Sequence, residues 1–301
     1  MNPARVDVWI PTRGRPAWCV EAVESVLAQT GVDARAVVAA DGAQPELEAL
    51  LAARADARVT FVASAAPRGR SAARNLAASA SAAPFVAFLD DDDRLLDERS
   101  LAVRVDALEA TPAAVLAYGR AVATDAEGRV REGARGAKAT RARVRDGLSD
   151  QLRGRSLLPS TVCLRRSAFD AAGGFDEDLA TGEDWLLFLR AARLGRFVDV
   201  GRPVVLYRRH GGQARGTPAE QEAALAVWMP RFFDDPATPA SARAHARRLR
   251  GRHLHWISRN YRHAGAAADA RRTFRAAVRD DPSLLLHPKR LARFVAALVG
   301  R

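Results

Sequence analysis

The sequence is poor in cysteine and has no long apolar segment. Its two cysteines, Cys19 and Cys163, lie far apart, which excludes a disulfide framework and a CxxC pair for metal or redox chemistry. We expect both to be small hydrophobic residues of the core. No apolar run reaches the roughly 18 residues that a bilayer requires, so the sequence predicts no transmembrane helix.

A secretion signal and an internal repeat are also lacking. The chain enters a strand pattern at Val6 without the basic, apolar and small-residue segments of a signal peptide. We therefore expect a cytoplasmic protein.

The composition is that of a folded protein with a basic surface. At 301 residues and 48% hydrophobic content, the chain can bury the core of one large domain or two modest ones, which excludes disorder of the whole chain. The net charge of +12 favours an anionic partner: nucleic acid, a phosphorylated substrate or an anionic membrane surface. Drift toward arginine in the composition would give the same charge, so charge alone selects no function.

Strand and helix patterns alternate four times within the first 90 residues. The expected strands cover residues 6–10, 34–40, 58–63 and 85–89, and the helices between them cover about 16–30, 45–55 and 71–81. This alternation predicts a parallel α/β sheet with helices on both faces. Ligands of such sheets bind beyond the carboxyl ends of the strands. Three of these ends are polar: Pro11 to Arg13, Asp41, and Asp90 to Asp93.

The alternation breaks down after a helix at about residues 99–110, which predicts a mixed sheet. Apolar runs flank Gly119 and Arg120, and strands are expected at 157–166, 197–200 and 203–210. Residues 131–150 are polar and basic, and we expect a mobile loop there, acting as a lid over the site. From Pro218 onward the pattern is helical.

The sequence FVAFLDDDDRLLD, residues 85–97, combines an apolar strand with four consecutive carboxylates. Four adjacent like charges repel one another, so solvent, a basic neighbour or a metal ion has to offset them. Without further context, a solvated acidic turn explains the stretch equally well.

Six motifs in order resemble the family 2 glycosyltransferases over about residues 5–215. They are VWIPTRGRP, AADG, RGRSAARN, FLDDDD, GGFDEDLATGEDWLLFLRA and YRRH. The resemblance implies a GT-A fold, a mixed and mainly parallel sheet flanked by helices, and an enzyme that uses nucleotide-diphospho sugars. We expect a GT-A domain at 1–215, with a nucleotide-sugar half at about 1–98 and an acceptor half at about 99–215, and a helical C-terminal extension at 216–301.

The resemblance implies that Asp90 and Asp92 bind the sugar nucleotide and a divalent cation, with Asp91 also on the donor and Asp93 secondary. Mg²⁺ or Mn²⁺ on hard carboxylate oxygens would stabilise the departing diphosphate as a Lewis acid. Asp41 matches the nucleotide-base aspartate, but Ala40 stands where the family has a first aspartate. A turn aspartate before a glycine is the alternative for Asp41.

Further residues match donor contacts of the family. Pro11, Thr12 and Arg13 resemble its opening nucleotide contact, and Arg70 and Arg74 lie in its ARN segment. An arginine there offers charge-assisted hydrogen bonds to the phosphates of a uridine or thymidine diphosphate. Arg74 would equally pair with the carboxylates at 90–93 and hold the strand end.

Glu183 and Asp184 match the family's ED motif, in which the aspartate is the general base of inverting members. A base is needed because an acceptor hydroxyl must lose its proton as it attacks the anomeric carbon. The alternative is a helix cap, since Thr181 precedes Asp184 by three residues. His210 matches a histidine that many relatives carry after their last core strand, where it would add an imidazole ligand to the metal. A lone loop histidine without function is the alternative.

The expected function is metal-dependent, inverting transfer of a sugar to a glycan or lipid-linked acceptor during polysaccharide, lipopolysaccharide or glycolipid synthesis. The basic amphipathic stretch at 289–299 would either rest on the inner face of a membrane or pack on the catalytic domain. One alternative is a nucleotide-sugar-binding protein without turnover, favoured by Ala40. A nucleic-acid-binding scaffold is disfavoured, because carboxylates at the strand ends repel phosphate.

Overall fold

The computed structural model describes residues 4–131, 139–213 and 216–286. The chain divides into two compact units, which are described separately. Unit 1 contains residues 1–147, 157–178 and 190–213, and unit 2 contains residues 148–156, 179–189 and 214–301.

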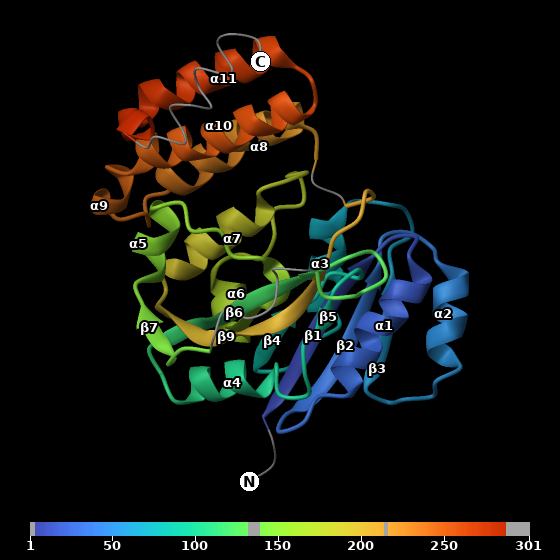
Figure 1. Cartoon of the computed structure of the whole chain (residues 1–301). Coiled ribbons are helices and arrows are strands. Elements are labelled where there is room, and N and C mark those ends of the chain that lie inside the picture. The colour runs from blue at the N-terminus through green and yellow to red at the C-terminus, as the bar shows by residue number, and fades with distance from the viewer. Residues whose placement is uncertain (1–3, 132–138, 214–215, 287–301) are drawn as a thin grey trace. The chain divides into compact units, whose positions relative to one another are not determined.

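The first part of unit 1 alternates strands and helices, as the sequence predicts (Figure 1). Pro16 and Pro45 occupy the first turns of their helices, where a missing backbone N–H costs nothing. The elements are β1 (Arg5–Thr12), α1 (Pro16–Leu27), β2 (Asp33–Ala40), α2 (Pro45–Ala52), β3 (Val59–Ala63), α3 (Arg70–Ser79) and β4 (Phe85–Phe88).

Two of the later strands are longer than the sequence predicts. The apolar runs around Gly119 form one continuous strand, and so do the two runs expected at 197–210, because these two long strands pair with each other through local register shifts. The elements are β5 (Arg94–Leu95), α4 (Ala102–Glu109), β6 (Ala114–Thr124), β7 (Arg143–Arg145), α5 (Gly147–Leu152), η1 (Pro159–Thr161), β8 (Val162–Arg165), α6 (Arg166–Ala171), α7 (Glu183–Ala192) and β9 (Arg196–Arg208).

The expected loop at 131–150 is wrong in its second half. Residues 143–145 form β7, which pairs antiparallel with β9, and α5 follows directly. Val144 is exposed although it lies in a strand, so the backbone pairing with β9 rather than an apolar face holds this segment. Residues 132–138 lie outside the described residues.

The described strands form one sheet in the order β3-β2-β1-β4-β8-β6-β9-β5, with β7 on β9. The first four of these strands are parallel, and β8 then runs antiparallel to both β4 and β6. The expectation of a mixed sheet is confirmed. Because β1 lies between β2 and β4, the carboxyl ends of these three strands are adjacent.

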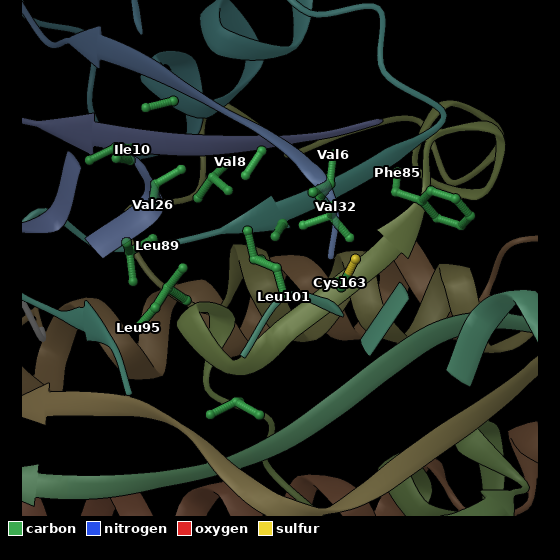
Figure 2. Close-up of a cluster of buried hydrophobic side chains, with 14 of the residues drawn as sticks. Val6, Val8, Ile10, Val26, Val32, Phe85, Leu89, Leu95, Leu101 and Cys163 are labelled. Carbon is green, nitrogen blue, oxygen red and sulfur yellow. The ribbon is translucent and has the colours of Figure 1, made fainter. Parts of the chain in front are cut away.

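Side chains alternate between the two faces of the sheet along β1, so each face has its own group of buried side chains. Val6, Val8 and Ile10 pack with α1, α2 and α4 in one apolar cluster (Figure 2). Trp9 instead contacts Phe88 and Phe169 in a separate aromatic group. Both cysteines are buried and unpaired with each other, and burial raises the thiol pKa of Cys19 to about 12 and of Cys163 to about 11, as expected of inert core residues.

Unit 2 is helical in its C-terminal part, as the sequence predicts. The helices are α8 (Pro218–Phe233), α9 (Ala240–Arg243), α10 (Ala246–His263) and α11 (Ala267–Asp280), followed by η2 (Pro282–Leu286). Trp228 and Phe232 of α8 lie in its apolar core with residues of α10 and α11. None of the described helices has the length and apolar character needed to cross a bilayer. The basic stretch at 289–299 lies outside the described residues.

Candidate active site

Three carboxylates gather directly after β4. Asp90, Asp92 and Asp93 each offer an oxygen that lies within 4.8 Å of the others, and no other group of three or more potential ligands occurs among the described residues. The cluster stands beside the end of β1, since the Leu89 amide donates to the Trp9 carbonyl at 3.1 Å. The prediction that a carboxylate group forms at this strand end is confirmed, with Asp93 as an additional member.

Asp91 points to the end of β1. Its Oδ2 accepts hydrogen bonds from Thr12 Oγ1 at 2.8 Å and from the Arg13 amide at 3.4 Å, and its Oδ1 pairs with Arg15 NH1 at 2.7 Å. Burial raises the pKa of the Asp91 carboxyl to about 6, although Arg15 and Thr12 act in the opposite direction. Asp91 therefore joins the first and fourth strand ends, and its role toward the donor stays a prediction.

Asp92 is held from two directions. Its Oδ2 lies 3.0 Å from Arg15 NH1 and 2.8 Å from His210 Nε2. The His210 ring lies against Trp18 of α1, with ring centroids 4.6 Å apart. The structure thus brings His210 to the carboxylate cluster, across 118 positions of sequence, as the proposed ligand role requires.

Asp90 pairs with Arg74 of α3. Arg74 NH2 lies 2.7 Å from Asp90 Oδ1, and the guanidinium also stands over the Phe175 ring at 5.1 Å. The Arg74 side chain is 2% exposed, against 32% for Asp90. The ion pair with an acidic-turn carboxylate, one of the two alternatives for Arg74, is present, and the role of Arg74 toward the donor phosphates stays a prediction.

Asp93 is the most deeply placed member of the cluster. Ser160 Oγ donates to its Oδ2 at 2.6 Å, and the Arg208 amide donates to its Oδ1 at 3.0 Å. Burial and the neighbouring Asp90 raise the pKa of this carboxyl well above its usual value. Ser160 also contacts the Asp90 amide at 3.2 Å, so one hydroxyl orients two residues of the acidic turn.

Asp41 braces the loop that precedes α3. Its Oδ1 accepts from the Arg68 amide at 2.6 Å and from the Gly69 amide at 3.0 Å, while Arg13 NH1 stands 3.8 Å from its Oδ2. Arg70 begins α3 immediately afterwards. Asp41, Arg13 and Arg70 thus lie around the loop that joins β3 to α3, and Pro11 lies in β1 paired with Ala39 of β2.

Glu183 and Asp184 are the first two residues of α7 and belong to unit 2. Asp184 Oδ1 accepts a hydrogen bond from the Trp185 amide at 2.8 Å, which fixes the carboxylate at the helix start. Trp185 stacks on Trp228 with an interplanar angle of 13°. The catalytic roles of both acidic residues stay predictions.

Three residues at the cluster were not found from the sequence. Arg15, Ser160 and Arg208 all contact the acidic turn directly, but they come from segments 67 to 116 positions away in the chain. Arg15 lies in the PTRGRP loop, whose basic residues were a usable signal. Nothing in the local pattern around Ser160 distinguishes it.

Solved structures confirm the fold. Residues 1–349 of S. aureus TarS superpose with a TM-score of 0.66 at 15% identity, covering 98% of this chain and 88% of that chain. The same protein in complex with UDP-GlcNAc gives a TM-score of 0.67 over 97% of this chain and 83% of the other. The GT-A architecture predicted from the sequence is confirmed by this likeness.

Curated relatives match over shorter stretches. A glycosyltransferase of Rickettsia conorii is 33% identical over 94 residues, 31% of this chain and 15% of the relative's length. Succinoglycan biosynthesis protein ExoO of Rhizobium meliloti is 40% identical over 80 residues, 27% of this chain and 23% of the relative. The matched stretches thus span less than a quarter of these two relatives.

The family model described as glycosyl transferase family 2 matches residues 7–171. This range contains most of β1, all of β2 to β4 and the acidic turn. Because the match covers more than half of the chain, the protein belongs to glycosyl transferase family 2.

Proposed function

We propose that the protein transfers a sugar from a nucleotide-diphosphate donor to an acceptor hydroxyl, with the aid of a divalent cation and with inversion of the anomeric centre. The observation that carries this proposal is the convergence of Asp90, Asp92 and Asp93 after β4, beside the end of β1. In parallel sheets, ligands bind at this edge. Family membership supplies the reaction class.

The chemistry of the cluster fits a divalent cation. Carboxylate oxygens are hard ligands that suit Mg²⁺ or Mn²⁺, and His210 adds a nitrogen that Mn²⁺ accepts. Burial first, and then the negative charge of Asp90, raises the pKa of the Asp93 carboxyl, and a cation would offset both effects. Asp90 and Asp92 are the proposed ligands, together with His210. A bound cation would supply electrophilic stabilisation of the diphosphate as it leaves.

The donor side is proposed to lie around Asp41 and the end of β1. Thr12 and Arg13 stand between Asp41 and the acidic turn, since they contact Asp91 or Asp41. Arg70 opens α3 after the loop whose amides bond Asp41, and it offers charge to phosphate oxygens. The likeness to TarS, which was crystallised with UDP-GlcNAc and with UDP, supports a uridine-type donor.

Asp184 is the proposed general base, with Glu183 as its neighbour in the ED motif. Its carboxylate is fixed at the start of α7 by the Trp185 amide. The base receives the proton of the acceptor hydroxyl while that oxygen attacks the anomeric carbon from the face opposite the diphosphate, which inverts the centre. The partial likeness to ExoO supports a polysaccharide acceptor. Residence in the cytoplasm stays a prediction from the sequence.

Nucleotide release tests this proposal. The purified chain is incubated with UDP-sugars and Mn²⁺, and liberated UDP is measured. We expect Asp184→Asn to lower turnover by at least about a hundredfold while UDP binding is retained, and Asp92→Ala to weaken metal-dependent UDP binding as well. Asp170→Asn, an exposed carboxylate on α6, is the matched control.

Two results would contradict parts of the proposal. UDP binding by the unaltered chain without any turnover, unchanged by Asp184→Asn, would indicate the nucleotide-sugar-binding protein that Ala40 suggests. A thermal-shift screen in which no nucleotide diphosphate stabilises the chain, with or without Mn²⁺, would refute the donor site itself.

A further inference from the structure

Arg15 occupies the position where charge compensation of the acidic turn is needed. Its NH1 lies 2.7 Å from Asp91 Oδ1 and 3.0 Å from Asp92 Oδ2, so a single nitrogen bridges two carboxylates. Its NH2 donates to the Gly212 carbonyl at 2.9 Å. One guanidinium therefore ties the acidic turn to the segment that follows β9.

We propose that Arg15 is an exchangeable internal cation: it neutralises Asp91 and Asp92 until a divalent ion arrives, and it then pairs with the donor diphosphate. This inference rests on the proposed function, because it concerns the same cation site. It assigns Arg15 a regulatory part in that site, which couples metal binding to donor binding.

Competition follows from the contacts of Asp92. Its Oδ2 already serves both Arg15 and His210, so an ion that uses this oxygen has to displace the guanidinium. An ion on the other oxygen would stand close to a positive charge in a site where Asp91 and Asp92 are largely shielded from solvent, and like charges repel strongly there. In either geometry, Arg15 opposes the bare ion.

The Arg15 side chain is more accessible to a ligand than the carboxylates that it bridges. Arg15 is 26% exposed, whereas the two carboxylates that it bridges are 6% and 9% exposed. It directly precedes α1 and follows Gly14, which has a left-handed φ of 73°. The space beside Gly14 is open, since a side-chain carbon added there would meet no heavy atom within 4 Å. A guanidinium at the rim of the site matches two phosphate oxygens in a bidentate geometry.

Exchange of this kind makes the two ligands cooperative. Displacement of Arg15 weakens the binding of the ion alone. The displaced guanidinium then strengthens the binding of the diphosphate by pairing with it. Each ligand must then raise the affinity of the other by the same factor, because coupling free energies are reciprocal. If Arg15 only supported the carboxylates, its removal would weaken ion binding instead of strengthening it.

The test measures Mn²⁺ affinity directly, by electron paramagnetic resonance of the free ion, with and without UDP. We expect Arg15→Gln to bind Mn²⁺ alone about tenfold more tightly than the unaltered chain, and the tightening caused by UDP to fall about tenfold. Arg15→Lys keeps the charge but lacks the planar guanidinium. Its Mn²⁺ affinity should lie between those of Arg15→Gln and the unaltered chain. Arg99→Gln removes an arginine of an exposed ion pair and is the matched control.

The outcomes separate this inference from the proposed function. If Arg15→Gln binds Mn²⁺ as weakly as the unaltered chain, or more weakly, while UDP still promotes binding, Arg15 is a support and the exchange is refuted, but the cation site stands. If neither chain binds Mn²⁺ at any UDP concentration, the cation site of the proposed function fails and the exchange fails with it. Melting curves without metal establish that each variant is folded.

Discussion

At the scale of single residues, His253 is a histidine of unit 2 whose surroundings oppose a charge. Its ring meets Trp185 and Trp228 edge-on, with centroids 4.4 and 5.0 Å apart. Its Nε2 is buried and has no hydrogen-bond partner within the described residues. Burial lowers the pKa of His253 from 6.5 to about 4. His255 instead contacts Phe274, so the two histidine rings of α10 have different surroundings.

The low pKa of His253 predicts a loss of stability in mild acid. Between pH 6.5 and 4, His253 is protonated in the unfolded chain but remains neutral in the folded chain. The free energy of unfolding therefore falls as the pH falls through this range. Between pH 7 and 5 the expected loss from this one group is about 2 kcal/mol. Urea unfolding at the two pH values measures it.

His253→Phe should reduce the difference in the free energy of unfolding between pH 7 and pH 5 by about 2 kcal/mol, because phenylalanine cannot be protonated. His263→Phe, at the exposed last residue of α10, is the matched control for replacing a histidine by phenylalanine. Equal pH dependence of His253→Phe and the unaltered chain would contradict the assignment.

At the scale of elements, β6 and β9 show how a glycine can be required inside a strand. A side-chain carbon added to Gly119 of β6 would stand 2.6 Å from Val204 Cγ2 and 2.8 Å from the Arg202 carbonyl of β9. The register between the two strands shifts at this point. The sequence suggested a break at Gly119, but the glycine permits a close approach of two continuous strands instead.

Gly119→Ala is therefore expected to destabilise the fold by about 1–3 kcal/mol, because the added methyl group forces β6 and β9 apart. The midpoint of urea unfolding should fall while the slope stays the same. Gly211→Ala is a matched control, since an added carbon there meets no heavy atom within 4 Å. A stability equal to that of the unaltered chain would show that the pair of strands adjusts without cost.

Local patterns predicted most elements because the signals were local. Pro16 and Pro45 marked helix starts, and β1 to β4 were found within a few residues of their bounds. β7 was missed, since it is three residues long and depends on β9 for its hydrogen bonds. A strand without an apolar face leaves no periodicity to detect.

At the scale of the whole molecule, the net charge of +12 acts on any anionic ligand. A positive field raises the association rate of a nucleotide diphosphate, and salt screens it. We expect the dissociation constant of UDP to rise about three- to tenfold between roughly 50 and 300 mM NaCl, measured by calorimetry at fixed Mn²⁺. Uridine, which carries no phosphate, should show no such change. An equal response of both ligands would exclude steering by charge.

The sequence by itself determined the order of strands and helices in the first part of the chain and the carboxylates after β4, because both are written in short-range patterns. Tertiary structure decided which side chains lie against each of those carboxylates. Asp90 pairs with Arg74, Asp92 with Arg15 and His210, and Asp93 with Ser160. These partners come from distant segments of the chain. Strand pairing brings the segments to one edge of the sheet: β4 pairs with β1 and β8, and β9 pairs with β5 and β6. The sequence motifs identify the acidic residues, whereas strand pairing in the sheet determines which side chains lie within a few ångströms of them.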